Sequence, residues 1–259
     1  MSIRTFANGL MAAAMSMAGV AAHSAAPATE DAWQGNYDAR QRCFETTVGP
    51  LPADILKMMS MLVVWPGGGL FFIPAPKLGT GLAVFTTFGL TNPDMPTTVQ
   101  ATNVEVTSDG KRSTGASATL SKRTAAPQRA GYAGYGYEMV MVAPMHEDWP
   151  VNFLQWAVNA EIGHDAGLLA RVEQNGGLSV EEIDVGDGRM VNVLIAKAVA
   201  PLPTGTLLPA GKMDVLVATT ITDQEMRWSQ RHGRSALLKK LQEGGVGQIS
   251  VLDRSSIVQ

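Results

Sequence analysis

The sequence predicts an α+β domain, and three observations lead to this fold class. Short apolar or β-branched runs, such as residues 82–88, are bounded by Pro and Gly, which is the pattern of buried strands. Two longer segments, preceded by Asp148 and Thr222, carry the start signals of helices. Hydrophobic residues make up 46% of the chain, enough to bury a core, so general disorder is excluded.

Length, charge and cysteine content exclude several other classes of protein. A chain of 259 residues predicts one or two domains. Its single cysteine, Cys43, cannot form an internal disulfide, and no Cys/His spacing typical of a zinc site occurs. With a formal net charge of -3, the chain has no overall attraction to nucleic acid or to anionic membranes. We therefore expect no nucleic-acid partner and no cofactor.

Residues 1–24 have the pattern of a signal peptide. Arg4 is their only charge, an apolar stretch covers residues 10–22, and small residues lead to a cleavage site at Ser24 and Ala25. The stretch is shorter than the roughly 20 residues that a membrane-spanning helix needs, so we expect no stable span. Export would place the protein in the periplasm or outside the cell. The alternative is an Ala- and Met-rich leader without export function, which leaves the protein in the cytoplasm.

Residues 25–49 read as a polar N-terminal segment, and the domain is expected to cover residues 50–259. Pro52 suits the first turn of a helix over residues 50–62, because the N–H that proline lacks would be unpaired there. We expect this helix to end before Trp65-Pro66 and the three glycines that follow. Residues 70–73 and 82–88 are predicted to be neighbouring core strands.

The segment at about residues 108–131 differs in composition from the rest of the domain. It is rich in Ser, Thr, Ala and Gly, and it carries basic residues such as Lys111, Arg112 and Arg129. Such a segment cannot bury enough apolar surface to offset its ordering entropy. We therefore predict a flexible basic insertion, followed by a strand over residues 135–143. Contact of the basic side chains with an acidic partner or with nucleic acid is the alternative interpretation.

Helices and strands alternate in the second half of the chain. Asp148 is suited to cap a helix over residues 149–164, in which an apolar face recurs at steps of three and four residues. Strands are predicted over residues 190–198 and 213–221. Thr222 and Glu225 form a capping box that begins a further helix, which breaks near Gly233 and resumes until Leu241. A final strand is predicted over residues 248–252.

The sequence holds no recognisable catalytic set, so we expect a protein that is not an enzyme. His146, Asp148, His164 and Asp165 are nevertheless of the residue types that bind divalent metals. A metal-dependent hydrolase that uses the region of His146 and His164 is therefore the alternative function. Both groups lie next to a helix end, where acidic residues complement the helix dipole without any ligand.

Several motifs, taken in their order along the chain, are similar to those of the suppressor of fused family. Residues 84–92, Val-Phe-Thr-Thr-Phe-Gly-Leu-Thr-Asn, resemble the aromatic-x-x-x-Gly-Leu-Ser/Thr end of a strand in that family. Residues 134–139, Gly-Tyr-Gly-Tyr-Glu-Met, resemble its G-[F/Y]-G-[F/Y]-E-L strand, and Trp149-Pro150 opens a helix. The helix after Thr222, residues 233–241 and a closing strand over residues 248–254 complete the order. The matches span about residues 50–259, and only their joint order is distinctive.

The resemblance implies a mixed, mainly antiparallel sheet with packed helices, and a protein-binding module in place of an enzyme. Animal members hold a short extended peptide between two lobes, partly as an added β-strand. Main-chain hydrogen bonds give affinity in such binding, which suits a domain without catalytic groups. Bacterial members, of which this chain is expected to be one, often accompany toxin systems, which implies an immunity or toxin-neutralising role. The expected partner is thus a protein, with a toxin as one form of it.

The expected contact region is the groove beside the helix over residues 149–164, with Trp156, Ala160, His164 and Asp165 as its residues. This chain departs from the animal pattern. The acidic and tyrosine positions that grip the peptide in animal members fall near Ala160 and in a rewritten stretch over residues 163–172. No second lobe is expected in this sequence. Recognition of the animal partner is therefore not transferred to it.

Overall fold

The structure is a computed structural model, and it describes residues 30–53, 63–64, 68–95, 97–108, 113–124, 129–186 and 188–259. For residues 63–64, 97–108 and 113–124 the description covers the backbone alone. The predicted signal peptide, with Ser24 and Ala25, lies outside the described residues, and so do residues 54–62 of the first predicted helix. In the described part of the chain, none of the helices has the length and apolarity to cross a membrane.

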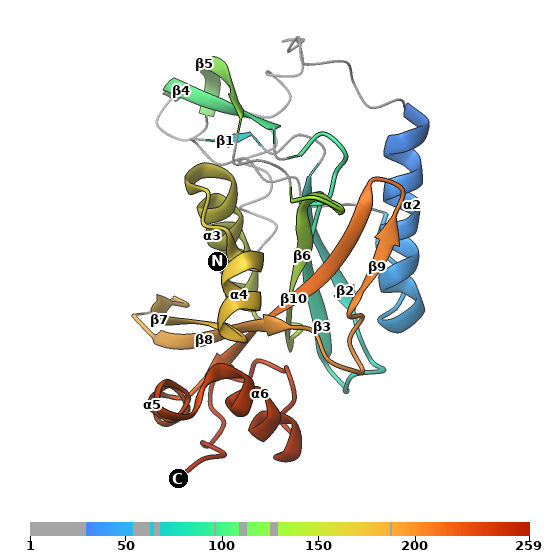
Figure 1. Ribbon diagram of the computed structural model, residues 1–259. Helices are drawn as coiled ribbons and strands as arrows, with labels where there is room; N and C mark the ends of the chain where they lie inside the picture. The colour runs from blue at the N-terminus through green and yellow to red at the C-terminus, as the bar shows by residue number, and fades with distance from the viewer. Residues whose placement is uncertain are drawn as a thin grey trace.

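A sheet of seven strands forms the centre of the fold (Figure 1). Its main path has the order β2, β3, β6, β10, β8, β7, and β9 pairs with β10 beside that path. The strands are β2 (Gly69–Pro74), β3 (Leu82–Phe88), β6 (Tyr132–Pro144), β7 (Leu178–Asp184), β8 (Met190–Lys197), β9 (Gly205–Leu208) and β10 (Gly211–Ile221). All neighbours pair antiparallel except β6 and β10, which are parallel. The predicted mixed, mainly antiparallel sheet is therefore confirmed.

Helices cover both faces of this sheet. On one face, α3 (Trp149–His164) and α4 (Leu168–Asn175) share a core with side chains such as Met139 and Leu216. On the other face, α2 (Glu30–Thr47) packs over the neighbouring positions Val140 and Val215. The helices α5 (Asp223–His232) and α6 (Arg234–Glu243) cover the β8 end of that second face. The alternation along each strand thus places an apolar layer on both sides of the sheet.

The strongest sequence patterns correspond closely to observed elements. The predicted strand over residues 82–88 and the helix over residues 149–164 have the bounds of β3 and α3, and β2 pairs with β3 as expected. The capping box is also confirmed, because the Glu225 N–H donates to Thr222 Oγ1 and the Thr222 N–H donates to Glu225 Oε2. Gly233 separates α5 from α6, as its position predicts.

Several elements differ from the predictions or were not predicted. The polar segment 25–49 contains α2, an 18-residue helix. Part of the predicted flexible insertion forms β5 (Ser113–Thr124), which pairs with β4 (Thr97–Ser108) beside the short β1 (Val63–Val64). Pairing between the two strands satisfies the hydrogen-bonding groups of the backbone there, so a strand forms although large apolar side chains are few.

The final strand predicted over residues 248–252 is wrong. Only Ile249 makes a bridge, to Val142 of β6, and the Ser250 N–H donates to the Val142 carbonyl at 2.7 Å. The reason is that β3 occupies one edge of β6, while β10 occupies the other edge as far as Val140. The chain turns at residues 247–248 and 252–253, on either side of the bridge, so it runs beside the rest of this edge too briefly to form a strand.

Candidate partner-binding surface

The residues predicted to contact a partner follow one side of α3. Trp156, Ala160 and His164 are four residues apart, so they lie above one another on the helix. The Trp156 side chain is 43% exposed and rests on Phe153, with 5.6 Å between the ring centroids. Ala160 is half-buried, whereas His164 and Asp165 are exposed at the end of the helix. This side of α3 therefore offers an exposed aromatic anchor, the residue type that contributes most in protein interfaces.

The structure does not assemble the alternative metal site. His146 precedes α3 and His164 is its last residue, and a helix of 16 residues is roughly 24 Å long at 1.5 Å per residue. Among the described residues, no group of three or more His, Cys, Asp and Glu side chains is placed to hold a metal ion. The two histidines are therefore too far apart to bind the same metal ion.

A buried carboxylate that the sequence analysis missed fixes the corner between α3 and α4. Glu161 accepts a hydrogen bond from the Tyr137 hydroxyl at 2.8 Å, and from the N–H groups of Gly167 at 3.0 Å and Leu168 at 2.9 Å. The backbone bonds satisfy donors at the start of α4 that would otherwise be unpaired. Burial, together with the negative charge of Glu161, raises the pKa of Tyr137 well above its usual value. The hydroxyl thus stays protonated and keeps the corner in place.

The strand β7 lies at one end of the sheet path and pairs only with β8 in the described part of the chain. Leu178, Val180 and Ile183 pack against the core on the α3 side, whereas Glu181 and Glu182 are exposed. The register shifts between Val180 and Ile183, so this edge strand carries a bulge. The opposite edge of β7 is left with N–H and C=O groups that can pair with another extended chain.

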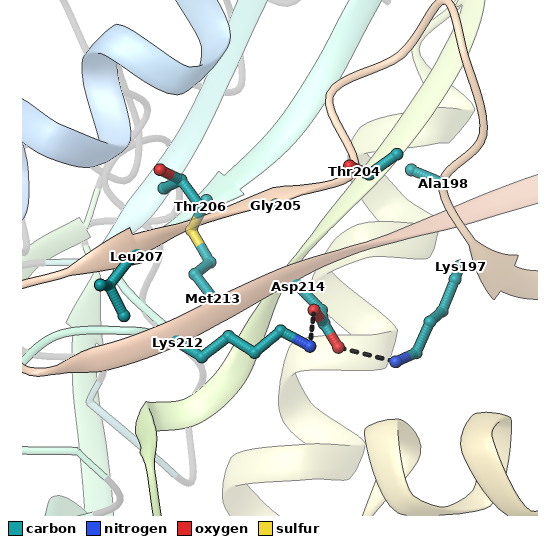
Figure 2. Close-up of a pocket in the computed structure, with 9 residues that line it drawn as sticks. All are labelled: Lys197, Ala198, Thr204, Gly205, Thr206, Leu207, Lys212, Met213 and Asp214. Atoms are coloured by element: carbon teal, nitrogen blue, oxygen red, sulfur yellow. Dashed lines mark hydrogen bonds and ion pairs between the residues drawn. The ribbon is translucent and has the colours of Figure 1, made fainter.

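A second polar surface lies on β8, β9 and β10, at an open pocket of about 490 Å³. Figure 2 shows the amino groups of Lys197 and Lys212 converging on Asp214, and each lies 2.8 Å from a different carboxylate oxygen. Asp214 is only 6% exposed. No spacing in the sequence indicates this site, because its residues come from strands that only the topology brings together.

The two motifs at residues 84–92 and 134–139, which are similar to those of the family, meet at the side chain of Glu138. This side chain is fully buried in β6. Its carboxylate accepts hydrogen bonds from the N–H groups of Gly89, Leu90 and Thr91, and from the hydroxyls of Thr87 and Thr91. The turn after β3 is therefore wrapped around one carboxylate. A glutamate in an otherwise apolar strand was the feature of the sequence that could have indicated this arrangement.

The countercharge for Glu138 comes from α2. Arg40 Nη1 lies 3.2 Å from Glu138 Oε1, and both side chains are fully buried. The guanidinium also stacks 3.9 Å from the centroid of the Phe88 ring. Burial lowers the pKa of Arg40, and Glu138 opposes that effect. The motifs thus build the interior of the scaffold, and its exposed edge and helix side remain available for contact.

Comparison with solved structures shows the same fold. A structure of the Sufu–Fu complex matches with a TM-score of 0.50 at 15% identity, over 87% of this chain and 92% of the other. Suppressor of fused from Drosophila matches at 0.49 and 16% identity, over 87% of this chain and 51% of the other, so this chain spans about half of it. A suppressor of fused homologue from Neisseria gonorrhoeae FA 1090 matches at 0.49 and 12% identity, over 88% and 98%.

No curated protein matches the chain in sequence. The model of the family described as "Suppressor of fused protein (SUFU)", however, matches residues 49–255. That range includes the β3 turn, the Glu138 strand, the helix after Trp149-Pro150 and the capping box of α5. The chain belongs to the suppressor of fused family.

Proposed function

We propose that this protein is a binding module that holds an extended segment of a partner protein along the outer edge of β7. The observation that carries the proposal is the position of β7 at the end of the sheet path, with its inner edge fixed by β8. Strand addition needs an edge with which no other strand pairs, as is the case for β7 among the described residues, because the backbone groups must be free to face the added chain. No bond of the partner needs to be made or broken.

The side chains around this edge define what the segment should carry. Glu181, Glu182 and Asp184 are exposed on or beside β7, so the bound segment should carry basic side chains. We propose that the exposed side of α3, defined by Trp156, Ala160, His164 and Asp165, provides a further contact. The similar structure of the Sufu–Fu complex supports the general activity, because a protein with this fold is bound there to another protein.

We also propose that the partner of this chain is a toxin, which the protein neutralises by occupying it. The support is the association of bacterial family members with toxin systems. If residues 1–24 direct export, that toxin acts outside the cytoplasm. Coexpression with the product of the neighbouring gene tests this form of the function. Growth arrest that this protein relieves, and that a variant with an altered β7 edge does not relieve, is the expected result.

The β7 proposal is tested with peptides selected by display against the purified protein. Hydrogen exchange of the backbone amides is then measured with and without a selected peptide. We expect slower exchange along β7 and unchanged exchange in α6. Glu181→Lys combined with Glu182→Lys should weaken binding, whereas the control Glu243→Lys on α6 should not. Protection that maps to other elements and leaves β7 unchanged would overturn the proposal.

A further inference from the structure

The β9–β10 hairpin has an uncovered face on the same side of the sheet as α4. Leu207 is directly opposite Lys212, and Gly205 is opposite Asp214, so these residues share one face of the hairpin. Leu207 is 78% exposed, whereas its neighbour Leu208, on the other face, is 3% exposed. An exposed leucine beside an ordered ionic cluster is a feature that the β7 edge does not explain.

The ionic cluster on this face is closed into a ring. Lys197 Nζ lies 2.8 Å from both Glu173 Oε1 and Asp214 Oδ2, and Lys212 Nζ lies 2.8 Å from Asp214 Oδ1. The Tyr132 hydroxyl completes the ring, because it accepts from Lys212 at 3.3 Å and donates to Glu173 at 3.4 Å. Four elements, α4, β6, β8 and β10, supply these side chains, so they are held in place before any ligand arrives.

The ring carries an excess of positive charge. Arg129 is a third cation, which pairs with Glu173 and lies over the Tyr132 ring at 4.6 Å from its centroid. Three cations therefore face the two carboxylates of Glu173 and Asp214. The hydrogen bond to Asp214 raises the pKa of Lys212. Each ammonium group has three N–H donors, and the contacts above use two of them on each lysine.

Gly205 lets β9 approach β10 closely at the wall of the pocket beside this ring. A Cβ atom at Gly205 would lie 2.2 Å from the Met213 carbonyl oxygen, and its φ of +138° is also unfavourable for other residues. The position therefore has no side chain, and it lines the pocket together with Thr204, Thr206 and the two lysines (Figure 2). The pocket of about 490 Å³ is large enough for an acidic side chain.

We propose that this face binds an acidic side chain of a partner protein, with its carboxylate between Lys197 and Lys212 and a neighbouring apolar side chain against Leu207. A single carboxylate suits the excess of one positive charge, whereas the repulsion from Asp214 and Glu173 disfavours a polyanion such as RNA. The inference rests on the proposed protein-binding function. It adds a contact that is separate from β7, so either can fail without the other.

The test uses two short, capped peptides that contain a leucine followed two positions later by either Glu or Gln. Backbone amide shifts of the isotope-labelled protein are recorded during titration to millimolar concentration. We expect saturable shifts at Gly205, Leu207 and Lys212 with the Glu peptide and none with the Gln peptide. Lys212→Gln should weaken binding about tenfold, the effect of one charge-assisted hydrogen bond. Lys239→Gln on α6 is the control.

In the Lys212→Gln variant, Asp214 still has its ion pair with Lys197. The amide spectrum of the variant reports whether the variant is folded. Leu207→Ser provides a second test, because an exposed side chain can be changed without loss of the fold. This substitution should also weaken the binding of the Glu peptide. Equal binding of the Gln peptide, tighter binding of inorganic phosphate or RNA, or the absence of shifts at this face would overturn the inference. Unchanged peptide binding at β7 would show that the proposed function survives that result.

Discussion

Single buried charges determine much of this fold, and the pair of Arg40 and Glu138 is the clearest case. Both side chains are fully buried, and Glu138 is the acceptor for the whole turn after β3. Arg40→Ala would leave this carboxylate in the interior without its countercharge. We expect a loss of about 3–5 kcal/mol in the free energy of unfolding, measured by urea denaturation. The control Arg42→Ala, on an exposed position of the same helix, should change it little; an equal loss in both variants would contradict this role of Arg40.

Glu225 makes stability depend on pH. Arg254 donates to both of its carboxylate oxygens at 2.6 Å, and the N–H groups of Thr222 and Ile257 donate as well. Burial alone would raise the pKa of Glu225, but these hydrogen bonds outweigh burial and lower it. Because the folded pKa is the lower one, this contribution is complete above the ordinary value of 4.5. It is lost as the pH falls through the folded pKa.

Urea midpoints measured from neutral to acid pH test this prediction. The native chain should lose stability as the pH falls below the ordinary carboxyl pKa, and Glu225→Gln should lack that part of the loss. The variant should already be less stable at neutral pH, by about 3 kcal/mol, because Arg254 loses its charged partner. Glu243→Gln, on an exposed position, serves as the control. Parallel pH profiles for the native chain and Glu225→Gln would rule out this role.

At the scale of elements, a comparison of two glycines distinguishes the cost of a strained backbone from the cost of a steric clash. Gly134 has a φ of +53°, and a Cβ atom there would lie 2.3 Å from the Leu90 carbonyl oxygen. Gly131 has a φ of +78° with open space around it. Gly131→Ala should therefore cost about 1 kcal/mol, the strain of the left-handed backbone. Gly134→Ala should cost more, because β6 must also move away from the turn. Equal thermal midpoints would show that the contact at Gly134 is relaxed without cost.

The helix α2 is predicted to be part of the folding unit, although the family match begins at residue 49. Besides Arg40, it supplies Phe44 to the core, and Asn36 Oδ1 accepts a hydrogen bond from the Ala210 N–H in the β9–β10 turn. A chain of residues 49–259 should therefore lose its cooperative thermal transition, whereas residues 30–259 should keep it. Circular dichroism during heating distinguishes the two. A cooperative transition in the shorter chain would contradict the prediction.

The elements with regular apolar patterns could be predicted, and those stabilised by polar contacts could not. Residues 82–88 and 149–164 show strand and helix periodicity, so β3 and α3 were found with their bounds. The buried residues of α2 are Asn36, Arg40 and Phe44. Because two of the three are polar, the sequence does not show the apolar face that marks a packed helix. In the same way, the acidic exposed residues of β7 kept this segment from being recognised as a strand in the sequence. The ring residues Glu173, Lys197 and Asp214 are far apart in sequence, and only the sheet topology brings them together.

At the scale of the whole molecule, a three-layer interior leaves separate exposed surfaces. Helices cover both faces of the sheet, and the parallel pair of β6 and β10 lies near its centre (Figure 1). In the part of the chain that the structure describes, the edge of β7, the exposed side of α3 and the open face of the β9–β10 hairpin are three surfaces that a partner can reach. A protein-binding function is consistent with this division, because these surfaces lie outside the packed interior.

The most direct test is nuclear magnetic resonance of the protein with a peptide selected against it, each labelled with different isotopes. We expect cross-strand contacts between backbone protons of the peptide and those of residues 178–184, as in a paired strand. A bound peptide that shows contacts only with other elements, and none with β7, would contradict it.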